Sequence, residues 1–106
     1  MSDEVEASHI LVMHKDSPRS RQTRTKDDAL TLAKDLQAKL KKGADFAELA
    51  RDESDCPSSR EGGSLGSFGK GMMVPEFEQA AFGLKVGETS GIVETDFGFH
   101  LIHRTG

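Results

Sequence analysis

Two histidines in apolar segments at opposite ends of the chain could carry chemistry. His9 lies in the segment Ala7–His14 and His100 in the segment 99–104. If these segments are neighbouring strands, the two imidazoles could meet on one face of a sheet, where one neutral ring donates a hydrogen bond and the other accepts it. A histidine inside a strand is, however, more often a satisfied core residue than a catalyst. Composition and spacing leave both roles open.

Cys56 is the third candidate, and it is the only cysteine in the chain. A thiol beside a histidine can act as a nucleophile, but a lone cysteine is more often a small buried residue. The glycine-rich segment after it contains neither the GxSxG pattern of a nucleophilic serine nor the GK[ST] ending of a phosphate loop. A single cysteine also excludes a disulfide framework and a CxxC metal site. We expect no metal and no cofactor.

Two further groups of residues could bind a ligand. Met72, Met73 and Phe77 surround Pro75 and could form an apolar cup, because methionine adapts its shape easily; ordinary core packing is the alternative. The segment 15–26 carries five basic residues and a single acid, Asp16, in a chain with a net charge of −4. This local surplus could attract an anion, although a solvated, mobile loop would have the same composition. The five basic residues are Lys15, Arg19, Arg21, Arg24 and Lys26.

The elements that would position these residues follow from periodicity and from helix-end signals. Alternation in the strand predicted at Ala7–His14 places His9, Leu11 and Met13 on one face. Two more strands, at 91–95 and 99–104, form a hairpin. Helices are predicted from Thr25 to Gly43, from Asp45 onward, and from Pro75 to Gly83.

Residues 52–71 separate the second helix from the third and hold five of the 11 glycines. A segment of this length is uncommon as a structureless loop in a compact domain and indicates function. The first and last strands are long and apolar, so we expect them side by side at the centre of an antiparallel sheet. The predicted class is α+β.

The composition bounds the class of protein. The chain has 106 residues, which is one small domain. Its negative net charge and its lack of Trp and Tyr argue against a nucleic-acid-binding protein. No run approaches the roughly 18 apolar residues of a membrane span, and the acidic start MSDEVEA is unlike a signal peptide. We therefore expect a monomer in the cytoplasm, with the nucleus as a further location, and a flexible segment 1–5 before a domain at 6–106.

Four motifs resemble those of parvulin-type peptidyl-prolyl cis/trans isomerases, in the order and spacing of that family. They are Ala7–Val12, Ser54–Cys56, the stretch from Gly63 to Phe77 and the closing segment 91–104. The match covers residues 6–106, nearly the whole chain. It implies a four-stranded antiparallel sheet surrounded by about four helices. It also implies a short second strand near 66–68 and a helical turn before Gly62 and Gly63.

The resemblance implies a function and a set of site residues as well. The activity would be faster rotation about X-Pro imide bonds in peptides and proteins; the alternative is a parvulin-fold chaperone or peptide-binding module with little catalysis. His9 and His100 match the family's paired histidines, and Thr95 matches the hydroxyl in their network. Cys56 matches an active-site position occupied by Cys or Asp. The pocket for the substrate proline matches Leu65, Met73 and Phe77.

A preference for phosphoserine or phosphothreonine before proline would follow from membership of the Pin-type subclass. Cys56 and the entry to the first helix at 23–26 resemble that subclass, and Arg19, Arg21 and Arg24 could bind a phosphate or another anion. Met13, however, replaces a basic residue of the Pin-type pattern. Val74 and Phe97 resemble the general parvulins instead. The sequence therefore leaves open both a preference for a phosphorylated residue before proline and the broader specificity of a general parvulin.

Overall fold

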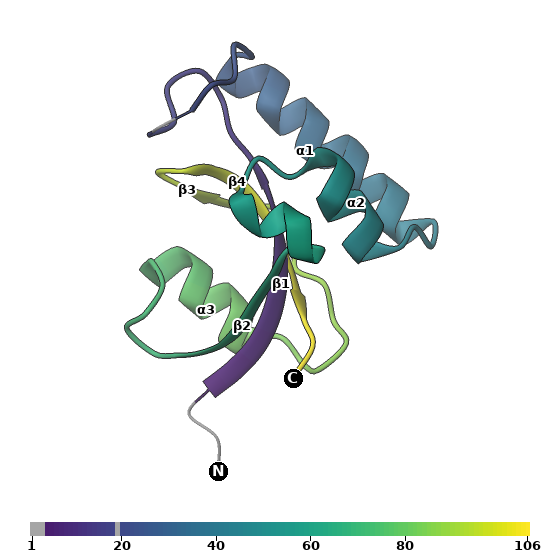
Figure 1. The fold of residues 1–106 in the computed structure, drawn as a ribbon, viewed down its shortest axis with the longest axis vertical. Coiled ribbons are helices and arrows are strands. Elements are labelled where there is room, and N and C mark those ends of the chain that lie inside the picture. The colour runs from purple at the N-terminus through teal and green to yellow at the C-terminus, as the bar shows by residue number, and fades with distance from the viewer. Residues whose placement is uncertain (1–3, 19) are drawn as a thin grey trace.

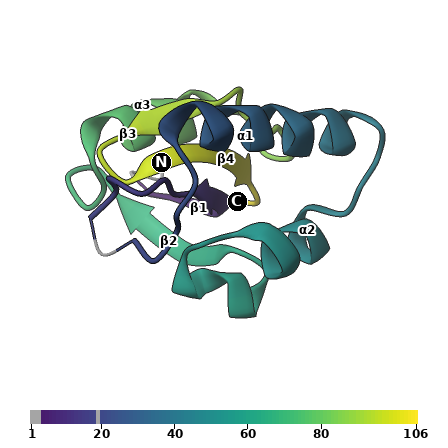
Figure 2. The same ribbon diagram turned by 90° about the horizontal axis from the view of Figure 1, so that it is seen from above.

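The computed structural model describes residues 4–18 and 20–106 of the chain. Within these residues, a four-stranded sheet is flanked by three α-helices and one 3-10 helix (Figures 1 and 2). The strands are β1 (Glu4–Val12), β2 (Ser64–Gly69), β3 (Val93–Thr95) and β4 (Gly98–Arg104), the α-helices are α1 (Lys26–Lys41), α2 (Phe46–Glu53) and α3 (Pro75–Gly83), and the 3-10 helix η1 spans Pro57–Glu61. None of the helices in this part of the chain is long and apolar enough to cross a membrane.

The sheet is antiparallel throughout, with the strand order β2-β1-β4-β3. The first and last strands therefore lie side by side at its centre, as predicted. The second strand and the helical turn that the motifs implied are present as β2 and η1. The α+β class and the four-stranded arrangement are confirmed.

The helices cover both faces of the sheet, and alternation along the strands decides what each face contacts. In Figure 1, α1 and α2 lie on one side of β1 and α3 lies on the other. Ile10 and Val12 of β1 pack in a cluster with α1 and α2, whereas Val5 and Ala7 pack in a second cluster with Phe77 of α3. His9 shares the face of Val5 and Ala7 because residues two apart point to the same side.

The helix ends agree with the sequence signals. Thr25 caps α1 by accepting a hydrogen bond from Asp28 N, and Asp45 caps α2 by accepting one from Glu48 N. Gly43 follows α1 with φ 101°, the left-handed conformation that glycine adopts without strain. Pro75 begins α3, where its missing N–H costs nothing.

The start of β1 differs from the prediction. The strand begins at Glu4 rather than Ala7, because Glu4, Val5 and Glu6 pair with β2. Val5 is buried beside Phe68, while the two glutamates are exposed. The sequence did not predict this half of the strand, because the polar residues on its solvent face interrupt the apolar run. The flexibility expected for segment 1–5 stays a prediction; Glu4 and Val5 belong to β1, and residues 1–3 lie outside the described residues.

The end of the chain is bound to the middle of β1. Glu6 N donates to Gly106 O at 3.1 Å, and Glu6 O accepts from Thr105 N at 2.8 Å and from Gly106 N at 3.0 Å. Three backbone hydrogen bonds thus hold the last two residues against the first strand.

Candidate active site

The two predicted histidines meet on the α3 face of the sheet. His9 of β1 and His100 of β4 are both buried, and their Nδ1 atoms lie 3.2 Å apart. The register pairs Leu11 with His100, so the histidines are diagonal neighbours, and their rings stack at 20° with centroids 5.4 Å apart. The expected contact is confirmed, while the catalytic role of the pair stays a prediction.

Thr95 sets the proton positions in this pair. Its Oγ1 lies 2.7 Å from His100 Nε2 and accepts from Phe97 N at 3.2 Å. Within residues 4–18 and 20–106 the hydroxyl proton has no acceptor other than His100 Nε2, so we assign Thr95 as the donor. His100 then carries its proton on Nδ1 and donates to His9 Nδ1. His9 consequently carries its proton on Nε2, a buried atom with no hydrogen-bond partner in the described part of the chain.

Both rings are held neutral by their surroundings. Burial lowers the pKa of His9 to about 4. Burial, and after it the nearby His9 ring, lower the pKa of His100 to about 3. Removal from water disfavours the charged imidazolium. At neutral pH the chain of hydrogen bonds from Thr95 to His9 is therefore intact, because it needs an unprotonated acceptor on each ring.

An apolar cavity of about 420 Å³ opens beside the histidines. The three residues predicted to hold a proline ring, Leu65, Met73 and Phe77, all line it. Phe77 presents its ring edge-on to both imidazoles, at 80° to His9 and 81° to His100. The cavity is at the small end of the about 300–1,000 Å³ typical of ligand sites, as a single ring and its flanking groups would require. We call it the cup.

Other residues of the cup extend the prediction. Leu11 and Met13 of the first strand segment line it on the same side as His9, and the alternation of the strand had already placed them there. Met72 lines the rim; its turn is held by Gly71 N, which donates to Glu78 Oε1 of α3 at 2.5 Å. Phe97, which is 41% exposed, also lines the cup. A hairpin-turn position gave no signal that Phe97 would reach this site.

Cys56 lies half-buried at the edge of the cup, at the start of η1. Its backbone N donates to Ser54 Oγ at 3.4 Å, and the same oxygen accepts from Leu11 N at 3.0 Å. Neither histidine activates the thiol, because His9 Nε2 has no partner and the other ring nitrogens contact one another or Thr95. In the described part of the chain, neither of these two histidines is placed to act as the base that a cysteine nucleophile needs.

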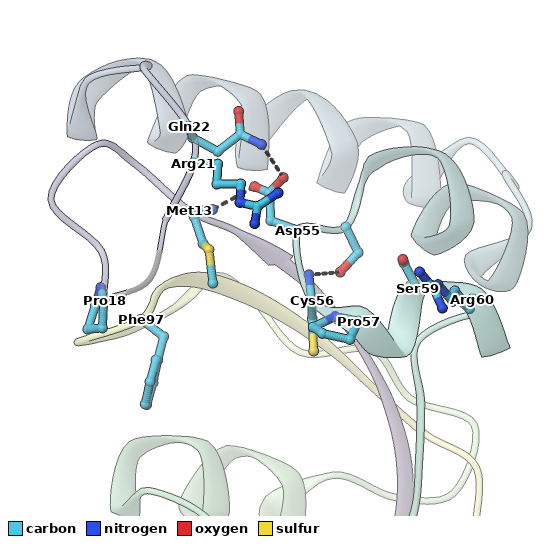
Figure 3. A pocket seen from close by; sticks show the side chains of 11 residues that line it. Met13, Pro18, Arg21, Gln22, Asp55, Cys56, Pro57, Ser59, Arg60 and Phe97 are labelled. Carbon is cyan, nitrogen blue, oxygen red and sulfur yellow. Dashed lines mark hydrogen bonds between the residues drawn. The ribbon is translucent and has the colours of Figure 1, made fainter.

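A second, more polar cavity of about 1030 Å³ continues from the cup (Figure 3). The two share Met13, Cys56, Pro57 and Phe97. We call this second cavity the groove. Arg21 lines it, as does Arg60 of η1, which the sequence analysis missed although it follows Cys56 by only four residues. No group of three or more His, Cys, Asp or Glu side chains in the described part of the chain could hold a metal.

The three arginines predicted to bind an anion have different positions. Arg21 faces the groove. Arg24 lines neither cavity; its Nη1 pairs with Asp55 Oδ2 at 2.8 Å and donates to Met13 O at 3.0 Å. Arg19 lies outside the described residues.

A sheet in this order, with an apolar cup against a stacked histidine pair, defines a parvulin-type prolyl isomerase domain. Comparison with known proteins agrees. The rotamase family, PPIC-type PPIase domain, matches residues 9–106. The chain belongs to this family.

Several peptidyl-prolyl cis-trans isomerases are similar to nearly the whole chain. It is 47% identical to peptidyl-prolyl cis-trans isomerase pin1 of Schizosaccharomyces pombe, over 97% of this chain and 63% of that protein. It is 45% identical to peptidyl-prolyl cis-trans isomerase Pin1 of Digitalis lanata, over 99% of this chain and 98% of that one. The structure of peptidyl-prolyl isomerase ESS1 from Candida albicans superposes with a TM-score of 0.92 at 42% identity, covering 98% of this chain and 63% of that one. The chain thus spans under two thirds of some relatives and nearly all of others.

Proposed function

We propose that this chain accelerates cis/trans rotation about X-Pro imide bonds in peptides and proteins. The observation that carries the proposal is the cup, an apolar cavity with Leu65, Met73 and Phe77 in its wall and two neutral histidines beside them, in a chain of the PPIC-type family. Rotation has a barrier of ~18–20 kcal/mol and takes tens of seconds unaided. Reaching milliseconds needs about four powers of ten, or roughly 5–6 kcal/mol.

The cup lowers the barrier to rotation without a covalent step. With the proline ring held against Phe77 and Met73, only the carbonyl side of the imide needs to turn. The twisted state loses amide resonance and is less polar than the planar ground state, so an apolar, water-poor site favours it. The neutral pair His9 and His100 keeps charge away from the ring, and His9 Nε2, which has no hydrogen-bond partner in the described part of the chain, would be a polar atom near the rotating bond.

The groove supports a preference for an acidic or phosphorylated residue before the proline. It is continuous with the cup, and Arg21 and Arg60 line it. Arginine suits such groups because its planar fork can donate two parallel hydrogen bonds to a carboxylate or a phosphate. We also propose that the enzyme acts as a monomer.

A protease-coupled isomerisation assay tests the proposal, with Ala-Pro, Glu-Pro and phosphoSer-Pro peptides compared side by side. We expect all three to be accelerated, with the two anionic peptides favoured at low salt, where surface charges are least screened. Arg21→Ala and Arg60→Ala should each reduce that preference, and Arg51→Ala on α2, outside both cavities, is the control. Equal kcat/KM values for all three peptides would remove the anion preference. Binding without acceleration of any peptide would indicate a peptide-binding module instead.

A further inference from the structure

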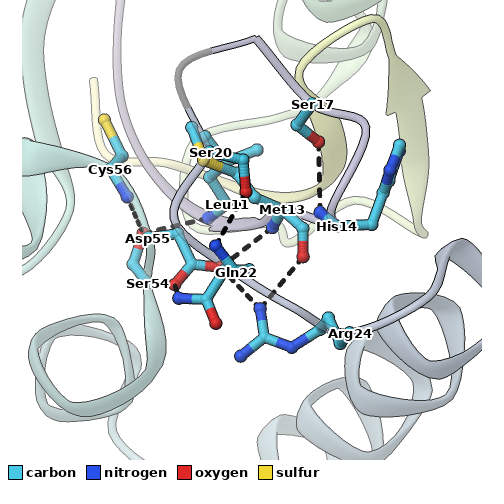
Figure 4. Close-up of polar contacts among 10 residues, drawn as sticks. All are labelled: Leu11, Met13, His14, Ser17, Ser20, Gln22, Arg24, Ser54, Asp55 and Cys56. Carbon is cyan, nitrogen blue, oxygen red and sulfur yellow. Dashed lines mark hydrogen bonds and ion pairs between the residues drawn. The ribbon is translucent and has the colours of Figure 1, made fainter.

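Asp55 places a carboxylate in the wall of the groove, directly before Cys56. The side chain is 12% exposed. One oxygen accepts from Met13 N at 2.9 Å and from Arg24 Nη1 at 2.8 Å, and the other accepts from Gln22 Nε2 at 2.7 Å (Figure 4). Three donors fix this carboxylate, and only Arg24 among them carries a charge.

A bare carboxylate at this position would oppose the binding of an anion. Interactions between charges are strong here because the group is largely removed from water. The side chain of Met13 lines both cavities and offers no positive charge. Arg24 is the cation in contact with Asp55, and it reaches the carboxylate without itself lining the groove. The groove is therefore cationic through Arg21 and Arg60 only as long as Arg24 neutralises Asp55.

We propose that the ion pair between Arg24 and Asp55 sets the charge selectivity of the groove. Arg24 is a positioning residue in this account: it determines which substrates are accepted by cancelling a fixed negative charge, without touching the substrate. Its loss would leave an unpaired carboxylate beside Cys56 and shift preference toward cationic residues flanking the proline. The loss of Asp55 would release a positive charge and shift preference toward anionic ones. The inference rests on the proposed function in that the groove takes the residue next to the substrate proline.

The experiment compares Glu-Pro, Gln-Pro and Lys-Pro peptides in four variants. Arg24→Gln removes the positive charge and keeps an amide donor. Asp55→Asn removes the negative charge, and a turn of the Gln22 amide restores an acceptor for the new NH₂ group. The double variant removes both charges, and Arg24→Lys retains the positive one. The readout is the ratio of kcat/KM for Glu-Pro to that for Lys-Pro, in which a general loss of activity cancels.

The two single variants should move this ratio in opposite directions. Arg24→Gln should lower it about tenfold, which corresponds to about 1.4 kcal/mol, and Asp55→Asn should raise it. The double variant should return close to the wild-type ratio, and Arg24→Lys should stay there. A purely structural role for the pair predicts lower melting temperatures with an unchanged ratio. An unchanged ratio, or a shift of both single variants in the same direction, would overturn the proposal.

Peptide affinity, measured by calorimetric titration of the same peptides, separates this inference from the proposed function. The affinity ratio of Glu-Pro to Lys-Pro should follow the same order across the variants, whether or not the chain accelerates rotation. If no peptide is isomerised while the affinity ratios still invert, the proposed function fails and the role of the ion pair stands. If catalysis is present and neither ratio changes, the role of the ion pair fails alone.

Discussion

Acidification should destabilise this domain in a pH window set by its two buried histidines. In the unfolded chain their pKa values return to about 6.5, whereas burial lowers that of His9 to about 4, and burial together with His9 lowers that of His100 to about 3. Below pH 6.5 the two histidines therefore bind protons in the unfolded state and remain unprotonated in the folded state. The stability that the neutral pair contributes is fully present above pH 6.5, and it is lost as the pH falls toward the folded values.

The magnitude can be worked from these values. Each histidine costs about 1.36 kcal/mol per pH unit below 6.5, which is about 2 kcal/mol between pH 7 and pH 5. Both together approach about 4 kcal/mol, a large part of the about 5–15 kcal/mol that holds a typical domain folded. Most carboxylates titrate below this window, since their ordinary pKa values are about 4.

The assay is urea denaturation followed by circular dichroism at half-unit steps from pH 7 to pH 5. We expect the free energy of unfolding to fall steadily across the series. A double variant, His9→Leu and His100→Leu, should show a much shallower dependence because it has no imidazole to protonate at these positions. Val86→Ala, at an exposed residue that does not titrate, should keep the wild-type dependence. Equal stability at pH 7 and pH 5 in the wild type would refute the assignment of a neutral buried pair.

Three further predictions concern the cup and its supports. Met73→Ala should lower kcat/KM about tenfold through lost apolar contact with the substrate, with little change in melting temperature. Its control is Val86→Ala, at an exposed residue outside both cavities, which should leave kcat/KM unchanged. Cys56→Asp should keep appreciable activity in the peptide assay, and a folded but inactive protein would contradict the non-covalent account. Gly63→Ala should lower the free energy of unfolding by more than about 1 kcal/mol, because the new Cβ would lie 2.3 Å from His9 O. Gly43 also has a positive φ but has open space around it, so Gly43→Ala should lower the free energy of unfolding by less in the same denaturation measurement.

The fold could be predicted where local signals and long-range pairing agree. Thr25, Asp45 and Pro75 mark helix starts by chemistry that acts within one turn, and the alternation around His9 assigns that strand's two faces. The start of β1 could not be predicted, because Glu4 and Glu6 become part of a strand only by pairing with β2, about 60 residues away.

The candidate site shows the same limit. The cup could be predicted because its motif residues resemble those of a known family. The groove could be predicted only in part. Its Arg21 belongs to the basic segment expected to bind an anion, but the ion pair of Arg24 with Asp55 joins segments 31 residues apart, and no pattern within either segment marks it. Anion binding by Arg24 stays a prediction; in the structure its side chain contacts Asp55 and Met13 O.

The hydrogen bonds between Glu6 and the last two residues bring the entry and exit of the domain to one point. If this domain were inserted into another protein, the two junctions with the host chain would therefore lie close together. Such a domain can be set into a surface loop of a larger chain without stretching the loop, or grafted to either end of one. For the same reason a short linker could join the start of β1 to the last residues. New termini could then be opened in the exposed turn 85–88, which gives a circular permutant with the same sheet, cup and groove.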